Sequence, residues 1–269
     1  MTAFAQRVAA LTGVGEERIE RLAGGDLSEV LLIRRADGRS SVAKRDLTGG
    51  AESAMLRAIA AAGVPAPRVE GEHDGVLLLE HIANDRVFSP AAWTDIGAAL
   101  RQLHGREAEQ YGWPIDYQIG TVALDNRERR DWTGFWAEQR LAATASVLDR
   151  PWRERVAGLA RQVGEIVRSA PRPALLHGDL WSGNILVSEG RLAALIDPAC
   201  YHGDAEVDLA MLTLFDTPGP SFWQAYGPLE AGWEQRRPLY QLFPALLHMR
   251  LFGDTYAGMV NRLLIRLGA

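Results

Sequence analysis

A short polar stretch held between two apolar segments constrains this chain more than any other feature. Leu175 and Leu176 precede it, Ile185 and Leu186 follow it, and between them residues 177–184 are rich in His, Asp, Ser, Gly and Asn. Apolar flanks of this kind predict two short buried segments. A polar loop fixed between buried segments is how a rigid scaffold presents catalytic groups. The sequence therefore predicts a catalytic loop here.

The loop carries an aspartate, Asp179, and an asparagine five residues later, Asn184; an apolar run, 192–196, then leads to Asp197. A positioned carboxylate accepts the proton of a substrate hydroxyl, and amide and carboxylate oxygens are the ligands that Mg²⁺ prefers. This pattern suits phosphoryl transfer. It predicts Asp179 as the catalytic base, which also orients the substrate, and Asn184 and Asp197 as the metal ligands.

The same residues resemble the catalytic loop and metal-binding segment of protein kinases, with His177-Gly178-Asp179 in place of His-Arg-Asp and Ile196-Asp197-Pro198 in place of Asp-Phe-Gly. The chain thus resembles the kinase-like small-molecule phosphotransferases, which include ketosamine (fructosamine) kinases, aminoglycoside phosphotransferases and choline kinases. Within that group, the sequence from His177 to Asn184 is similar to the ketosamine kinase version.

Two aromatic regions strengthen the resemblance to ketosamine kinases. One holds Gly112-Trp113 and the turn Ile119-Gly120-Thr121, and the other is a predicted helix from Trp132 to Leu141 with a Trp-x-x-Phe and a Glu-Gln-Arg-Leu sequence. Most aromatic residues in a folded domain pack in its core, and the same is expected of most of these. The resemblance runs in order along nearly the whole chain, from Gly24 to Gly253.

The resemblance implies an α+β, bilobal, protein-kinase-like fold. Residues 1–82 would form a small N-lobe that binds nucleotide, and residues 83–269 a larger, mainly helical C-lobe with the catalytic loop, metal site and substrate pocket. The local patterns agree with this division. A short amphipathic helix is predicted at 2–11, and short apolar segments and Gly turns from there to Ile82 predict strands with a further helix at 50–60. After Ser89-Pro90 the pattern changes from strands to helices.

A glycine turn between the first two predicted strands is a candidate phosphate-binding loop. Gly24 and Gly25 let backbone amides approach a phosphate closely, and Ser28 adds a hydroxyl. Some family members carry a cysteine in this turn, and here that position is Asp26, so a disulfide switch in this loop is impossible.

The resemblance assigns four more residues to nucleotide binding. Val42-Ala43-Lys44 is similar to the kinase strand whose lysine contacts the nucleotide phosphates, and Glu52, in the following helix, matches the glutamate that fixes that lysine. The segment after the apolar strand 76–82 matches the hinge, so the backbones of Glu80 and Ile82 are expected to contact adenine. The implied cofactors are ATP and Mg²⁺.

Other residues of the C-lobe take supporting or substrate roles by resemblance. His177 and Asp208 would support the catalytic loop, and His104 would be a packed or capping histidine. Trp181, which lies between the base and a metal ligand, would form the floor of the acceptor pocket and stack on a sugar face; packing between the lobes is the alternative.

The implied substrate is a ketosamine, a sugar joined through C1 to an amine, which is phosphorylated on its O3 hydroxyl. The product is unstable and releases the amine, so the implied role is deglycation repair. An aminoglycoside or choline acceptor is the nearest alternative, for which Asp204 and Glu206 would supply an acidic pocket. A nucleotide-binding pseudokinase is the alternative from another class, but Lys44 and the other catalytic residues are present.

The composition argues against several kinds of binding partner and metal site. A net charge of −5 and a pI near 5.7 argue against a general nucleic-acid binder, and the one basic cluster, 127–130, is typical of a solvated loop. The single cysteine, Cys200, excludes an internal disulfide and a cysteine-based zinc site and is expected to be a buried thiol. No apolar stretch is long enough to span a membrane, so a cytoplasmic protein is expected, as a monomer or a homodimer.

Overall fold

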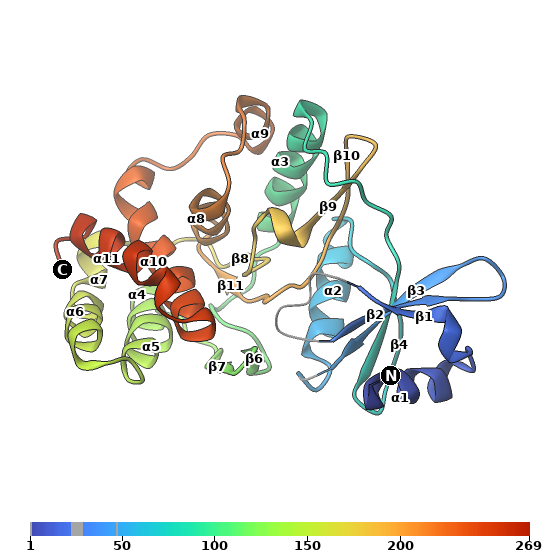
Figure 1. Ribbon diagram of the computed structural model, residues 1–269. Helices are drawn as coiled ribbons and strands as arrows, with labels where there is room; N and C mark the ends of the chain where they lie inside the picture. The colour runs from blue at the N-terminus through green and yellow to red at the C-terminus, as the bar shows by residue number, and fades with distance from the viewer. Residues whose placement is uncertain (1, 23–28, 47) are drawn as a thin grey trace.

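The structure is a computed structural model that describes residues 2–22, 29–46 and 48–269. Its N-terminal part is a five-stranded antiparallel sheet in the order β1-β2-β3-β5-β4. In chain order its elements are α1 (Ala3–Thr12), a 3-10 turn (Glu16–Arg18), β1 (Ile19–Arg21), β2 (Val30–Arg34), β3 (Ser40–Arg45), α2 (Ala51–Ala61), β4 (Val69–His73) and β5 (Val76–Glu80). Figure 1 shows this sheet with α1 and α2 beside it.

The two helices cover opposite faces of the sheet. Successive residues of a strand point to opposite sides, and each helix packs on a different set of β5 residues. Phe4 and Val8 of α1 pack against Leu78 of β5 in one cluster. Leu56 of α2 packs against Leu77 and Leu79 of β5 in another cluster. Strand β5 is therefore buried on both faces, which explains its continuous apolar sequence.

The C-terminal part is mainly helical, with short hairpins between the helices (Figure 1). The helices of this part are α3 (Pro90–His104), α4 (Trp132–Gly134), α5 (Ala143–Ala145), α6 (Arg150–Ala160), α7 (Val163–Ile166), α8 (Glu206–Phe215), α9 (Pro220–Tyr226), α10 (Trp233–Phe252) and α11 (Ala257–Arg266). The strands are β6 (Tyr117–Ile119), β7 (Val122–Leu124), β8 (Ala174–Leu175), β9 (Ile185–Ser188), β10 (Arg191–Leu195) and β11 (His202–Gly203). The fold prediction, an antiparallel sheet plus helix joined to a helical lobe, is confirmed.

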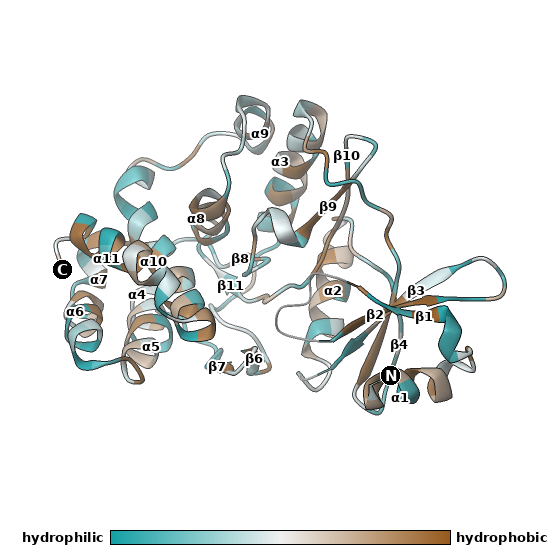
Figure 2. Ribbon diagram, viewed as in Figure 1, coloured by the Kyte–Doolittle hydropathy of each residue, from teal (hydrophilic) through white to brown (hydrophobic). Residues whose placement is uncertain are grey.

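Local sequence explains where several of these elements begin and end. Ser89 caps α3 by accepting a hydrogen bond from the Ala92 amide at 3.1 Å, with Pro90 at the first helical position. The helix predicted from Trp132 does begin there, but from Phe135 to Ala142 it is a π-helix. Figure 2 shows hydrophobic residues concentrated in α8 and along strands of the sheet, and these elements contribute buried residues to two core clusters.

The connection between the two parts is anchored to the β9–β10 hairpin. The Asp85 amide donates to the Val187 carbonyl at 2.9 Å, and the Glu189 amide donates to the Asp85 carboxylate. We propose the lobe boundary within this connection, at residues 82/83, as the sequence predicts. Among the described helices, none has both the length and the apolar character that crossing a bilayer requires.

Candidate active site

The predicted catalytic loop lies between β8 and β9, and a buried aspartate holds its first residues. The carboxylate of Asp208 accepts hydrogen bonds from the amides of His177 at 2.7 Å and Gly178 at 2.9 Å, and His104 Nε2 lies 3.1 Å from it. Burial alone would raise the pKa of Asp208, but the hydrogen bonds from His104 and Gly178 hold it below its usual value. Asp208 thus binds the loop as an anion.

Gly178 explains why this chain has His-Gly-Asp where protein kinases have His-Arg-Asp. Its φ is +82°, and a Cβ built on it would lie 1.9 Å from the Ala199 carbonyl oxygen. The loop therefore passes directly over the segment after Asp197, which leaves room for no side chain at this position.

Both ring nitrogens of His177 are engaged in supporting this loop. Its Nε2 lies 3.0 Å from the Ile196 carbonyl, and its Nδ1 lies 3.4 Å from the Asp179 amide. The ring is fully buried, and burial lowers its pKa. A neutral ring that donates from Nε2 and accepts at Nδ1 satisfies both contacts, so this histidine is placed for support and has no nitrogen free for proton transfer.

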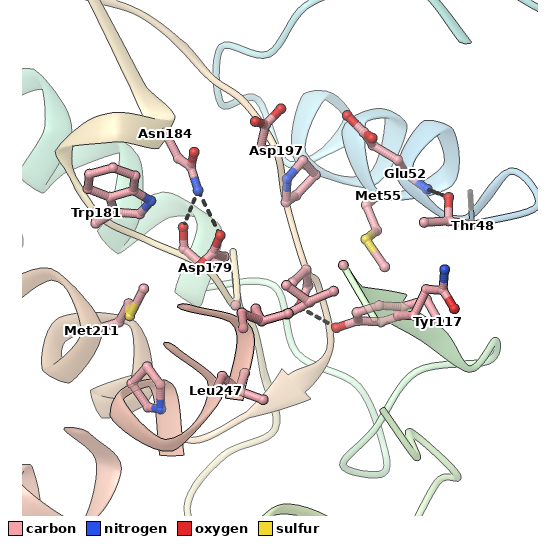
Figure 3. A pocket seen from close by; sticks show the side chains of 18 of the residues that line it. Thr48, Glu52, Met55, Tyr117, Asp179, Trp181, Asn184, Asp197, Met211 and Leu247 are labelled. Carbon is pink, nitrogen blue, oxygen red and sulfur yellow. Dashed lines mark hydrogen bonds between the residues drawn. The ribbon is translucent and has the colours of Figure 1, made fainter. Parts of the chain in front are cut away.

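The predicted base and one predicted metal ligand contact each other directly. Asn184 Nδ2 donates to the Asp179 backbone carbonyl at 2.7 Å and to its carboxylate at 3.0 Å. Burial raises the pKa of Asp179 to about 7, against the opposing effect of the Asn184 hydrogen bond. Figure 3 shows the two side chains facing each other, with Asp197 and Glu52 further along the same pocket.

The β9–β10 hairpin brings the second predicted metal ligand to the first. Leu195 pairs with Ile185, and the Ile196 amide donates to the Asn184 carbonyl at 3.0 Å. Asp197 follows at once, with a φ of +53°. The antiparallel pairing therefore places Asn184 and Asp197 at the same end of the hairpin although they are thirteen residues apart.

Lys44 links the sheet to this end of the hairpin. Its Nζ lies 2.5 Å from a Glu52 oxygen and 2.7 Å from an Asp197 oxygen, and the lysine is only 7% exposed. Burial alone would lower the pKa of Lys44, but the two carboxylates outweigh burial and raise it. The lysine is therefore a fixed cation, aligned by α2 and pointed at the predicted metal site.

The donor set at Asn184 and Asp197 fits Mg²⁺. Asn184 directs its amide nitrogen to Asp179, which leaves its oxygen as a ligand, and the Asp197 side chain is 45% exposed. Within the described ranges, no group of three or more His, Cys, Asp or Glu side chains forms a metal cage. Two oxygen ligands are enough for Mg²⁺ when substrate phosphates and water complete its octahedron.

The nucleotide side of the site is described only in part. Gly24, Gly25 and Ser28, with the neighbouring Asp26, lie outside the described residues. The Glu80 amide donates to the Arg68 carbonyl at 2.9 Å, so sheet pairing occupies it and it is not available to adenine. The Ile82 carbonyl lies 3.3 Å from Asn84 Nδ2, whereas the Ile82 amide has no hydrogen bond within the described chain.

The other side of the pocket is largely apolar, and sequence analysis missed most of it. Trp181, the residue that the resemblance assigns to the acceptor pocket, lines this side and is 36% exposed. A Cβ on Gly183 would lie 2.2 Å from the Trp181 ring, so the ring lies flat over this glycine. The residues that sequence analysis gave no role here are Tyr117, Gln118, Met211, Phe243, Pro244, Leu247, His248, Leu251 and Phe252. The Ile119-Gly120 turn also reaches the pocket, and only its resemblance to ketosamine kinases pointed to it.

Asp204 and Glu206 do not form the acidic pocket that an aminoglycoside or choline acceptor would require. Both are buried: Asp204 binds Arg168 at 2.6 Å, and Glu206 binds Arg236 at 2.6 Å. That prediction is wrong because each carboxylate is neutralised by an arginine inside the helical part. Cys200 is fully buried, as predicted, and burial raises the pKa of its thiol well above its usual value.

Comparisons with known proteins identify the family of this chain. A family model described as fructosamine kinase matches residues 2–268. A probable ketoamine kinase of Enterococcus faecium is 37% identical over 180 residues, 63% of this chain and 65% of that protein. The chloroplastic protein-ribulosamine 3-kinase of Arabidopsis thaliana is 32% identical over 207 residues, 72% of this chain and 63% of that protein. The match therefore spans about two thirds of the length of these curated relatives.

Solved structures extend the similarity to the whole fold. A candidate fructosamine-3-kinase from Thermobifida fusca has a TM-score of 0.85 and 30% identity, with 99% of each chain covered. A thermostable mutant of an aminoglycoside phosphotransferase, solved with AMP-PNP and hygromycin B, covers 98% of this chain with a TM-score of 0.66 at 17% identity, which shows the fold alone. With its kinase-like site and a family match over almost its whole length, the chain belongs to the fructosamine kinase family.

Proposed function

We propose that this protein is an ATP-dependent ketosamine 3-kinase, which phosphorylates the O3 hydroxyl of a sugar joined through C1 to an amine. The observation that carries this proposal is the chain of contacts from Glu52 through Lys44 to Asp197, set in one pocket with the contact between Asn184 and Asp179. A phosphate-binding cation, two metal ligands and a base thus surround a single pocket. Phosphoryl transfer requires these groups and little else from a protein.

Each residue has a defined part in the transfer. Asp179 orients the acceptor hydroxyl and takes its proton as the O3 oxygen bonds to the γ-phosphorus. The bond from the γ-phosphorus to the β–γ bridging oxygen breaks, and ADP leaves. Lys44, fixed by Glu52, holds the non-transferred phosphates, and Asn184 and Asp197 would hold Mg²⁺. When bound there, Mg²⁺ supplies neutralisation of the phosphate charge during transfer.

Nucleotide recognition follows from the same arrangement. Gly24, Gly25 and Ser28 are proposed to cover the phosphates, and the Ile82 amide is the group left to donate to adenine. Glu80 is proposed to act through its carbonyl, since its amide is occupied by Arg68. Trp181 is proposed to stack on the sugar of the acceptor, while Asp208 and His177 keep the loop in place.

The apolar acceptor side favours a ketosamine over a polycation. Met211, Leu247 and Phe252 line the pocket together with Trp181. The two carboxylates expected to supply an acidic pocket for an aminoglycoside, Asp204 and Glu206, are buried in ion pairs. A pseudokinase would lack the base, the lysine or a metal ligand, and all of these line the pocket. The proposed role is deglycation repair in the cytoplasm, where ATP and glycated amines occur together.

An ADP-release assay tests this proposal. Mg-ATP is supplied with a ribulosamine, a fructosamine, kanamycin or choline, and the Asp179→Asn variant is the blank. Turnover confined to the two ketosamines supports the proposal and ranks its sugar preference. Turnover only with kanamycin or choline would keep the mechanism and refute the substrate. Binding of Mg-ATP by calorimetry without turnover of any acceptor would favour the scaffold alternative.

A further inference from the structure

A second hollow lies next to the acceptor side of the pocket, and aromatic rings form most of its wall. It is bounded by the end of α8, the end of α10 and the 3-10 turn Asp254–Tyr256. Its lining residues are Trp181, Phe215, His248, Phe252, Thr255 and Tyr256. Trp181, His248 and Phe252 line both this hollow and the pocket that holds Asp179. The two spaces therefore lie on either side of the same three side chains.

The rings form a connected set around His248. Its ring centroid lies 4.8 Å from that of Phe215, 5.0 Å from that of Tyr256 and 5.6 Å from that of Phe252. Trp181 joins at 6.2 Å from Phe215. The rings pack on one another at tilted angles, as aromatic pairs prefer, and all of them line the hollow.

His248, one of the residues that line this hollow, has a neutral ring with one acceptor nitrogen. Its Nδ1 lies 2.9 Å from the Pro244 carbonyl, which can only accept, so Nδ1 carries the hydrogen. Burial lowers the pKa of His248, which favours the neutral form. Nε2 then has a free lone pair, and it has no hydrogen-bond partner within the described ranges.

Two of these rings remain exposed although they are large and apolar. Trp181 is 36% exposed and Phe252 is 40% exposed. No lysine or arginine of the described chain lines the hollow. A space bordered by aromatic faces, an acceptor nitrogen and no cation is suited to a positively charged group that carries apolar substituents.

The geometry of transfer directs the substrate toward this hollow. The acceptor hydroxyl must lie at Asp179 and attack in line, with the phosphates on the Lys44 side. The remainder of the acceptor then extends away from Lys44, past Trp181 and toward His248. In a ketosamine that remainder is the protonated secondary amine and its substituent.

We infer that this aromatic hollow is the subsite for the amine half of the substrate, and that it selects ketosamines whose amine carries an aromatic or apolar group. The inference rests on the proposed function and adds a specificity that the function does not require. Cation–π contacts hold the ammonium, His248 Nε2 accepts one of its hydrogens, and Phe252 and Tyr256 cover the apolar substituent.

The experiment compares two ketosamines of the same sugar, one made from phenethylamine and one from ethanolamine. Both are cations with the same two-carbon linker, and one ends in an apolar phenyl ring where the other ends in a hydroxyl. For the wild type we expect kcat/KM to be about tenfold higher with the phenethylamine derivative, since an apolar group in a fitted pocket gives a factor of that order. Phe252→Ala should reduce this preference to about twofold, mainly through KM, because the substituent is remote from the reacting atoms.

Ile265→Ala is the matched control. Ile265 lies on α11, is 63% exposed and lines neither space, so this variant should keep the wild-type preference. Tyr256→Leu is a second test variant at the opposite side of the hollow and should also lower the preference. Equal kcat/KM for the two ketosamines, or an unchanged preference in both test variants, would overturn the subsite and leave the proposed kinase intact. Failure to phosphorylate any ketosamine would overturn both.

Discussion

Replacing the proposed base with its amide, Asp179→Asn, should stabilise the fold at neutral pH while removing most of the activity. Burial raises the pKa of Asp179 from 3.8 to about 7 in the folded protein. In the unfolded chain the carboxyl loses its proton near pH 4. Between pH 4 and 7 the folded state therefore binds more protons than the unfolded state, and the wild-type free energy of unfolding falls as the pH rises. An asparagine has no such dependence.

The size of the effect follows from the pKa shift. A shift of about three units corresponds to roughly 4 kcal/mol, at about 1.36 kcal/mol per unit. Asp179 keeps partial contact with solvent, which reduces the effect, so we expect a gain of about 1–3 kcal/mol above pH 7. The amide has the same shape, and its oxygen accepts the Asn184 hydrogen bond that the carboxylate accepts at 3.0 Å. The loop geometry is therefore preserved.

Urea unfolding of both proteins at pH 5, 6, 7 and 8, with EDTA and without nucleotide, measures this difference. The stability gain of Asp179→Asn over the wild type should grow from pH 5 to 7 and then level off. Asp95→Asn is the control. Arg191 holds the pKa of Asp95 below its usual value, so Asp95 stays ionised from pH 5 to 8 and the change in stability caused by this substitution should be the same at all four pH values. The kcat of Asp179→Asn should fall about 10²- to 10⁴-fold.

Two results would refute this reasoning. Parallel stability curves for Asp179→Asn and the wild type would mean that Asp179 is ionised in the fold at all these pH values. Turnover of Asp179→Asn close to that of the wild type would remove Asp179 from the mechanism, whatever its effect on stability.

Three further variants test the neighbouring groups. Glu52→Gln should raise the KM for ATP about tenfold while the fold stays intact, because Lys44 loses a carboxylate 2.5 Å away; an unchanged KM would show that Asp197 alone fixes the lysine. Asp197→Ala should weaken Mg-ATP binding about tenfold or more in calorimetry and leave metal-free ATP binding less affected, and unchanged Mg-ATP affinity would contradict its assignment as a ligand. Gly178→Ala should lower the free energy of unfolding by at least about 2 kcal/mol, since the φ of Gly178 is +82° and a Cβ would lie 1.9 Å from the Ala199 carbonyl oxygen. Urea unfolding at pH 7 measures this loss, and a stability equal to that of the wild type would exclude the close approach.

The N-terminal sheet could be predicted from the sequence because its pattern is local. Apolar residues in β2 and β5, glycine turns between strands and one strong helix former at α2 each specify their own element. The continuous apolar sequence of β5 was enough to predict that both of its faces are buried. The resemblance then supplied the order in which these elements belong together.

The acceptor side could not be predicted in the same way. Met211, His248 and Phe252 lie on α8 and α10 and line the pocket, whereas many other apolar side chains of these two helices pack in the core. Asp204 and Glu206 looked available for a cationic substrate, yet Arg168, after α7, and Arg236, on α10, pair with them and neutralise them. Such ion pairs join residues about thirty positions apart, so no local pattern reports them.

The sequence by itself determined the proposed chemistry of this protein, because Asp179, Asn184 and Asp197 are spaced along a loop and a hairpin whose short connections leave few ways to arrange them. Only the tertiary structure decided which charges face the substrate and which are buried, and how the ends of α8 and α10 meet Trp181 to form the aromatic hollow. The physical reason is that catalytic geometry here follows from backbone pairing over short distances, whereas the acceptor pocket depends on how distant helices pack.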